Sequence, residues 1–240
     1  MANFPFQRLQ SDLAALIEHT PAGSRLMSEP ALAKQLGVSR ATLREAMRTF
    51  ETKGLIRRRQ GAGTFVVGKV PVIESGLEVL QSLETMAHRM NLAITISDLN
   101  LEQIEATEDY AVGLGVEMET CLTRIRRVIR ADTRPVAYLI DILPEHVLLL
   151  RDIPEGFNGS VLDFLLERGD DLPISRAAIS ATNATAEVAK ALEIQRGDVL
   201  LQFVSQLYTA EGQIVDYSIS YFIPGYFHFH VNRRVGTDSL

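Results

Sequence analysis

The stretch from Ser28 to Val67 constrains the possible fold more than any other part of the chain, because it contains residues typical of the start and the end of successive helices. Ser28 is a good N-cap, and Pro30 suits a first helical turn. Gly37 is expected to end that helix, since glycine enters the left-handed region without a steric penalty, and Ser39 is positioned to begin another. This order predicts two short helices joined by a tight turn.

The second of these helices has two different faces. Its apolar residues recur at the spacing of one buried stripe, namely Leu43, Ala46, Met47 and Phe50. Its arginines recur at every fourth position on another side, namely Arg40, Arg44 and Arg48. We expect the stripe to face a core, the arginines to face outward, and Gly54 to end the helix.

Two short strands are expected next, over residues 55–60 and 64–67, around Gly61 and Gly63. A helix fits the major groove of B-DNA, and an arginine near its N-terminal end can bind guanine. Glycine at a hairpin tip lets the backbone approach a sugar-phosphate wall, and arginines 57–59 flank this tip. An isolated row of arginines is usually a solvated helix face. Here the caps, the turn and the hairpin agree with it, so the pattern predicts DNA binding.

The predicted DNA contacts come from the helix starts, the second helix and the hairpin. Hydroxyl groups and exposed N–H groups at both helix starts suit phosphates. The set predicted from these features is Ser28, Ser39, Arg40, Thr42, Arg44, Arg59, Gly61, Gly63 and Thr64.

Residues 28–67 closely resemble the winged helix-turn-helix of the GntR family of bacterial transcription regulators. The matching motifs are S-E-x-x-L-A from Ser28, L-G-V-S-R-x-T-x-R-E-A from Leu36, and G-L-I-x-R-x-Q-G-x-G-T-F-V from Gly54.

The resemblance implies that Arg40 and Arg44 read bases, and that Gln60 with Gly61 enters the minor groove. The family usually has an arginine where this chain has Pro30. One operator contact is therefore expected to be missing or supplied from elsewhere in the chain.

Charge is distributed unevenly along the chain. The 240 residues carry a net charge of −6, which alone argues against nucleic acid. Residues 1–68, however, hold 10 Lys and Arg against 5 Asp and Glu, so they carry +5 and the remainder carries −11. A basic head on an acidic body suits a DNA-binding protein. The single Cys121, the lack of a membrane-length apolar run and the lack of a signal-peptide core favour a cytoplasmic protein.

These observations predict three parts. Residues 1–68 form the DNA-binding domain, residues 69–92 a linker and connecting helix, and residues 93–233 a second domain. A first helix in the head is indicated by an apolar stripe between Phe6 and Ile17. In the middle part, a helical pattern resumes at Ser75 and predicts a helix to about Met90.

An internal repeat organises the second domain. Ala189 lies 78 residues after Ala111, and Pro224 lies 80 residues after Pro144. Each copy consists of a short helix and a hairpin; chance similarity of two hairpins is the alternative. The strands are expected over residues 120–130, 135–143, 199–209 and 214–223, with a helix over 160–168 and a strand over 174–184 between the copies. The predicted fold class is α+β, with a winged helix-turn-helix followed by an antiparallel sheet with helices.

This second region resembles, more loosely, the UTRA effector-binding domain of the HutC subfamily, which has a chorismate-lyase-like fold and binds small metabolites. The matching motifs are R-x-x-x-A-D-x-x-P from Arg127, A-x-x-L-x-I from Ala189 and G-x-x-V-D-Y from Gly212. The resemblance implies effector contacts from Arg127, Ser160, Asp216 and Phe222, and Arg176 is a further candidate.

Relatives carry a second arginine where this chain has Ile129. A less charged or differently shaped effector is therefore as compatible with the site as a phosphorylated sugar. The neighbouring arginines are expected to form surface salt bridges; they are Arg124, Arg126, Arg130 and Arg134.

Enzymatic chemistry has little support in the sequence. His228 and His230 could share one face of a strand, but they lack a third ligand at zinc spacing, and no nucleotide or nucleophile motif occurs. We predict no cofactor and no metal. The predicted function is a homodimeric repressor that binds operator DNA and a small-molecule effector. An activator of the same family is the first alternative, and an enzyme of the lyase-like fold fused to a DNA-binding head is the second.

Overall fold

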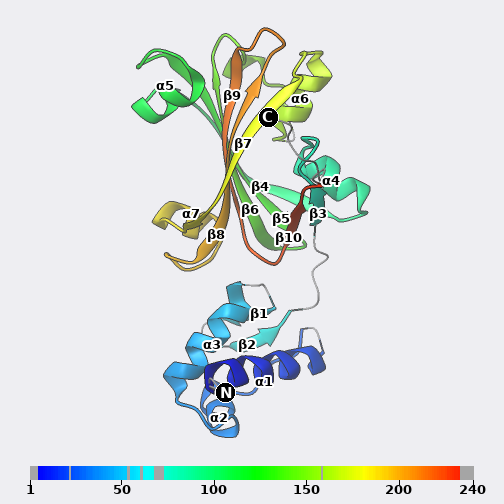
Figure 1. Ribbon diagram of the computed structural model, residues 1–240, viewed down its shortest axis with the longest axis vertical. Helices are drawn as coiled ribbons and strands as arrows, with labels where there is room; N and C mark the ends of the chain where they lie inside the picture. The colour runs from blue at the N-terminus through cyan, green and yellow to red at the C-terminus, as the bar shows by residue number, and fades with distance from the viewer. Residues whose placement is uncertain are drawn as a thin grey trace, which may run out of the picture. The chain divides into compact units, whose positions relative to one another are not determined.

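The computed structural model describes residues 5–21, 23–52, 55–59, 62–67, 73–157 and 159–232. The chain divides into two compact units, one built on the residues up to 72 and the other beginning at Ile73. Figure 1 labels the helices and strands of both units.

The N-terminal unit consists of three helices and a hairpin. Its elements are α1 (Pro5–His19), α2 (Glu29–Gln35), α3 (Arg40–Thr52), β1 (Ile56–Arg59) and β2 (Gly63–Val66). The two strands pair antiparallel, and the N–H of Leu26 adds a 2.8 Å hydrogen bond to the carbonyl of Thr64 in β2. The predicted winged helix-turn-helix is confirmed.

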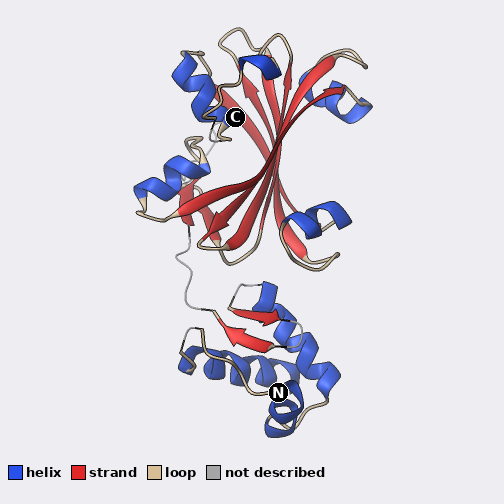
Figure 2. Cartoon of the chain, turned by 180° about the vertical axis from the view of Figure 1, so that it is seen from behind, coloured by secondary structure: helices blue, strands red, loops and turns tan. Residues whose placement is uncertain are grey.

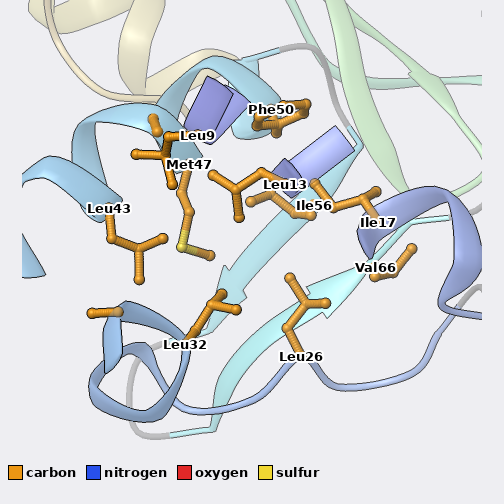
Figure 3. Close-up of a cluster of buried hydrophobic side chains, with 12 residues drawn as sticks. Leu9, Leu13, Ile17, Leu26, Leu32, Leu43, Met47, Phe50, Ile56 and Val66 are labelled. Atoms are coloured by element: carbon orange, nitrogen blue, oxygen red, sulfur yellow. The ribbon is translucent and has the colours of Figure 1, made fainter. Parts of the chain in front are cut away.

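One apolar core joins these five elements (Figure 3). The predicted stripe of α3 supplies part of it, with Leu43, Ala46 and Met47 fully buried and Phe50 6% exposed. The other buried side chains come from α1, α2 and the hairpin, and include Leu9, Leu13, Ile17, Leu32, Ile56 and Val66. This core fixes the direction in which the opposite side of α3 points.

The turn between α2 and α3 follows the sequence prediction. Gly37 has a φ of 66°, in the left-handed region, and Val38 N–H donates back to the carbonyl of Ala33 at 3.0 Å. Ser39 caps α3, because its Oγ accepts a 3.1 Å hydrogen bond from the N–H of Thr42. Gly54, the predicted end of α3, lies outside the described residues.

The C-terminal unit is built on a six-stranded antiparallel sheet in the order β4-β5-β6-β9-β8-β7. The strands are β4 (Ile94–Glu105), β5 (Cys121–Ala131), β6 (Arg134–Pro144), β7 (Ile174–Asn183), β8 (Val199–Tyr208) and β9 (Ile214–Phe222). The helical elements are α4 (Leu83–Arg89), α5 (Glu108–Leu114), η1 (Leu150–Asp152), α6 (Val161–Arg168) and α7 (Ala186–Ala191). A separate parallel pair joins β3 (Ile73–Gly76) and β10 (Phe227–His230).

The sheet has an internal two-fold pattern. Its first half runs β4-α5-β5-β6 along the chain, and its second half runs β7-α7-β8-β9. The halves meet where β6 pairs with β9, and Ile140 lies opposite Ile219, 79 residues later. The shared order of strand, helix, strand and strand makes the two halves correspond element by element.

Helices cover both faces of this sheet (Figures 1 and 2). On one face, α5 packs over a cluster that includes Leu122 and Ile142. On the other, α6 packs over a cluster that includes Ile125 and Leu143. Successive strand residues alternate between the two faces, so the register determines which side chains share a face.

The prediction for residues 75–90 was wrong in part. Ser75 lies in strand β3, not in a helix, and α4 begins only at Leu83. Ser82 caps α4 by accepting a hydrogen bond from the N–H of Thr85 at 2.9 Å. The leucines at 77 and 80 that suggested helical spacing are exposed, at 38% and 50%. Strand β4, which lies at one edge of the sheet, was not predicted.

Candidate nucleic-acid interface and buried charge cluster

The N-terminal end of α3 presents a polar surface. Ser39 and Arg40 are exposed, and the Arg44 side chain, one turn later, is 57% exposed. The hydroxyl oxygens of Ser39 and Thr42 lie 2.8 Å apart. Because the first N–H groups of a helix point out of its start, this end combines hydrogen-bond donors with guanidinium groups. The structure therefore brings these four predicted residues together.

Arg44 is held by an acidic residue at the start of α2. Its Nε donates to Oε2 of Glu29 at 2.6 Å. Arg58 of β1 donates to the carbonyl oxygen of Arg44 at 3.2 Å, and its Nε lies 3.9 Å from Oε1 of Glu29. Exposed ion pairs add little stability, but the Glu29 contact orients the Arg44 guanidinium, and Arg58 holds the backbone of the same residue. Sequence reasoning missed both positioning residues, although Glu29 belongs to the S-E motif.

The hairpin has a crowded glycine near its tip. Gly63 has a φ of +110°, and a Cβ there would lie only 2.5 Å from Nε of Arg25. Arg25 is exposed beside the hairpin and was not predicted as a contact residue. Thr64 is 5% exposed, so its side chain is buried in the unit. Gln60, Gly61 and the Arg59 side chain lie outside what the structure describes.

The start of α2 is also exposed. Ser28 is the N-cap, and its side chain makes no capping hydrogen bond to the helix. Pro30 is exposed in the first turn, where it replaces the arginine usual in the resembling family. A proline has no donor to offer an outside ligand.

A buried charge cluster occupies one face of the C-terminal sheet. Arg127 is 5% exposed, Asp141 is 8% exposed, and a hydrogen-bonded ion pair joins them. In the β5–β6 register, Ile125 lies opposite Asp141 and Arg127 lies opposite Leu139, which places the pair diagonally on one face. Glu84 of α4 approaches from outside the sheet, with Oε1 3.8 Å from Nε of Arg127.

Asp216 belongs to the same face. The β6–β9 register places Asp141 opposite Ser218, and Asp216 lies two positions before Ser218 on β9. Asp216 is 6% exposed. Burial raises the pKa of its carboxyl well above the usual range, and the nearby Asp141 adds to this; a backbone hydrogen bond with Ile142 and the charge of Arg127 oppose the shift.

Two helix starts meet this cluster. Ser160 is 1% exposed and caps α6 by accepting a 3.3 Å hydrogen bond from the N–H of Asp163. The hydroxyl of Ser82, at the start of α4, donates to Oδ2 of Asp163 at 2.7 Å. Gly159 has a φ of +89°, and a Cβ there would lie 2.8 Å from Cδ of Arg127. The glycine thus lets the start of α6 approach the arginine.

The other two predicted effector residues lie elsewhere. Arg176 is exposed on β7, where it lines a cavity of about 260 Å³ with Tyr217 on the opposite face of the sheet. Phe222 is buried among aromatic rings, with its centroid 4.8 Å from that of Phe227 and 5.1 Å from that of Phe203.

Surface salt bridges were correctly predicted for three other arginines of β5. Arg124 and Arg126 each have a guanidinium nitrogen within 2.9 Å of Oε1 of Glu102. Arg130 lies 2.9 Å from Oε1 of Glu193. These side chains share the sheet face opposite Arg127.

Sequence reasoning missed three residues of the cluster: Ser82, Glu84 and Asp141. Asp141 could have been found, because it is the one acidic residue in the otherwise apolar run of β6. Glu84 and Ser82 gave no such signal, since the helix to which they belong was placed with the wrong start.

Two further findings concern the described residues only. They contain no group of three or more His, Cys, Asp and Glu side chains placed to hold a metal ion. They also contain no helix that is long and apolar enough to cross a membrane.

Two family profiles match the chain. Residues 6–66 match "Bacterial regulatory proteins, gntR family", and residues 89–228 match the UTRA domain. Among curated proteins, the HTH-type transcriptional repressor NagR of Bacillus subtilis (strain 168) is 34% identical over 200 residues, which cover 81% of this chain and 79% of NagR. The mannosyl-D-glycerate transport/metabolism system repressor MngR of Escherichia coli (strain K12) is 24% identical, covering 82% and 81%.

Solved structures share the fold. PhnF from Mycobacterium smegmatis superimposes with a TM-score of 0.63 at 21% identity, covering 95% of this chain and 100% of that chain. The isolated effector domain of PhnF gives a TM-score of 0.60 at 19% identity and covers 68% of this chain.

Proposed function

This chain belongs to the GntR family of bacterial regulatory proteins and carries a UTRA domain, and from this premise we propose that it represses transcription until a small metabolite binds its C-terminal unit. Its relatives are transcription regulators, so it is a DNA-binding regulator and not an enzyme. Repression is favoured over activation because NagR and MngR are both named as repressors.

The arginine-bearing side of α3 is the observation that carries this proposal. Arg40 and Arg44 read base edges in the major groove, and Ser28, Ser39 and Thr42 contact phosphates. The hairpin around Gly63 approaches the adjacent minor groove, and the contacts proposed there are those of Arg59, Gln60 and Gly61. The support is the exposed start of α3, the Glu29 contact that orients Arg44, and the basic charge of residues 1–68.

The cluster around Arg127 is the proposed effector site, with Ser160 and Asp216 among its contacts. Its support is the convergence of β5, β6, β9 and two helix starts on one buried arginine. Glu84 and Ser82 lie on the first segment of the C-terminal unit, shortly after β3. A ligand that contacts this segment in one arrangement better than in another shifts the population between them, which is what control of DNA binding requires.

The proposed assembly is a homodimer joined at β7. This strand lies at one edge of the sheet. Its side chains alternate between the two faces of the sheet, and most of them are exposed. It carries one charged residue, Arg176, whereas the opposite edge, β4, carries three acidic residues and a bulge between Ser97 and Asn100. Charges and bulges protect edge strands from pairing, so β7 is the edge that can accept a second copy.

The DNA assignment is tested by gel shift on the DNA upstream of the gene that encodes this chain. Arg44→Ala should lower operator affinity by roughly 10- to 100-fold, since one bidentate base contact is worth about 1–3 kcal/mol. Arg151→Ala removes an arginine that is 81% exposed in the other unit and serves as the control. Equal affinities of the Arg44 variant and the wild type would refute the assignment.

A further inference from the structure

The charges of the Arg127 cluster do not balance. One arginine faces the carboxylates of Glu84, Asp141 and Asp216, and Asp163 at the start of α6 adds a fourth carboxylate beside Glu84. Arg127 already forms an ion pair with Asp141, and its buried Nε, 3.8 Å from Oε1 of Glu84, has no hydrogen-bond partner among the described residues. Ile129, two residues further along β5 on the same face, is fully buried and brings no second positive charge. With Arg127 and the four carboxylates ionised, the cluster carries a formal charge of −3.

Specific oxygen atoms in this cluster lack donors. Both carboxylate oxygens of Glu84 and Oδ1 of Asp216 are buried, with no hydrogen-bond partner among the described residues. Asp216 itself is 94% buried and lies on the sheet face that carries Arg127 and Asp141. A buried acceptor without a donor is costly, and a charged one more so. What this site lacks is positive charge, and its three unpaired acceptor oxygens outnumber its one unpaired donor, the Nε of Arg127.

We propose that the effector presents a cationic nitrogen, as a small protonated amine, amidine or imidazole, to the carboxylates of Glu84 and Asp216. This inference rests on the proposed function, in which the Arg127 cluster holds the effector. The cation reduces the surplus of negative charge, and its N–H groups donate to the unpaired oxygens. A phosphorylated or carboxylate effector brings more negative charge and more acceptors to a place that already has a surplus of both.

The proposal also predicts how affinity for the effector depends on pH. Burial raises the pKa of Glu84, the charge of Arg127 opposes this shift, and the charges of Asp163 and Asp141 add to it. Burial and the charge of Asp141 also raise the pKa of Asp216. A bound cation favours the ionised carboxylates, so its binding releases protons from this pair. Affinity for a cationic effector should therefore increase as pH rises through the raised pKa values, and affinity for an anion should decrease.

The test uses the full chain and thermal-shift assays at pH 6 and pH 8. The cationic probes are agmatine, putrescine, histamine and a broad panel of other small amines. The neutral counterparts are amines in which every basic nitrogen is acetylated, such as N,N′-diacetylputrescine, and they are used where they exist. Inorganic phosphate, glucose 6-phosphate and citrate are the anionic probes. We expect at least one amine to raise the melting temperature, more at pH 8 than at pH 6, and its acetylated counterpart to have no effect.

Isosteric variants locate the binding. Asp216→Asn and Glu84→Gln should each weaken binding of that amine by roughly 10- to 100-fold, the effect of losing one charge-assisted hydrogen bond. Asp171→Asn removes an exposed carboxylate and should leave binding unchanged. Circular dichroism and retained operator binding show that each variant is folded.

The inference is overturned if no amine gives a shift that Asp216→Asn removes, or if only the anions bind. In either case operator binding by the unliganded wild type can still hold, so the regulator function survives this failure. Conversely, amine binding by a chain that shifts no upstream DNA would support the ligand class and reject the proposed function.

Discussion

Arg44 is an exposed side chain whose conformation is restricted by a neighbouring residue of the same unit. Its Nε lies 2.6 Å from Oε2 of Glu29, and Arg58 holds its backbone carbonyl. An arginine side chain in water has many rotamers, and their loss on binding lowers affinity. Contacts that restrict these rotamers beforehand reduce that loss, so in the proposed DNA complex Glu29 favours binding through Arg44.

The burial of Asp216 leads to a prediction about how the stability of the protein depends on pH. The folded-state pKa of its carboxyl is raised above the unfolded value of about 3.9 by burial and by Asp141. Between those two pKa values, the folded protein holds a proton that the unfolded chain has released. Wild-type stability therefore falls as pH rises through this window, and Asn, which does not titrate, removes that loss.

Asp216→Asn should accordingly raise the unfolding temperature of the ligand-free protein, and by more at pH 8 than at pH 5. Thermal unfolding followed by circular dichroism measures this difference, with Asp171→Asn as the exposed control. A difference between variant and wild type that stays constant or shrinks with rising pH would contradict the assigned burial.

At the level of elements, the turn between α2 and α3 sets the angle of α3, the helix proposed to read DNA bases. Gly37 has a φ of +66°, and a Cβ at this position would meet nothing within 4 Å. The cost of Gly37→Ala is therefore confined to the backbone, about 1–2 kcal/mol for a left-handed alanine. Asparagine tolerates this region better, so Gly37→Asn should cost less.

Native-state hydrogen exchange of the α2 and α3 amides measures this cost directly. Gly156→Ala is the matched control, because its Cβ also meets nothing within 4 Å and Gly156 does not have a positive φ. An equal loss of protection for alanine and asparagine at position 37 would show that backbone strain is not the cause.

The sheet shows which strands could be predicted from the sequence and which could not. Its strands β5, β6, β8 and β9 were expected close to their observed bounds, because each alternates or runs apolar between clear turns. Strand β4 was missed, since Asp98, Asn100 and Gln103 break its apolar pattern. The side chains of β4 are exposed or only partly buried, so its sequence lacks the regular alternation of apolar and polar residues that marks a strand.

For the whole molecule, the proposed dimer is the main expectation. The chain has a mass of 26.6 kDa, and analytical ultracentrifugation should find about twice that value. Ile179 is 46% exposed on β7, and Ile179→Lys places a charge on the proposed seam. We expect this variant to sediment as a monomer and to bind its operator more weakly.

Leu99→Lys is the control for that experiment, because Leu99 is 39% exposed on β4 at the opposite edge of the same sheet. It should leave the dimer intact. Dissociation by Leu99→Lys with Ile179→Lys still dimeric would move the seam to β4.

The DNA-binding unit could be predicted from the sequence almost entirely. Its caps, its glycine turn and the stripe from Leu43 to Phe50 are local signals, each determined by neighbours a few residues away. The predicted effector residues Arg127, Ser160 and Asp216 also meet in the fold. Arg176 and Phe222 do not join them, because strand register places one on the opposite face and aromatic packing surrounds the other.

The sequence by itself determined the class of this protein, its two units, the side of α3 that carries arginine, and the repeat within the sheet. These depend on periodicity and on turn chemistry, which act over short distances along the chain. Only the tertiary structure decided which acids surround Arg127. Glu84, Asp141 and Asp216 are far apart in sequence, and strand register together with the docking of α4 brings them to one buried place.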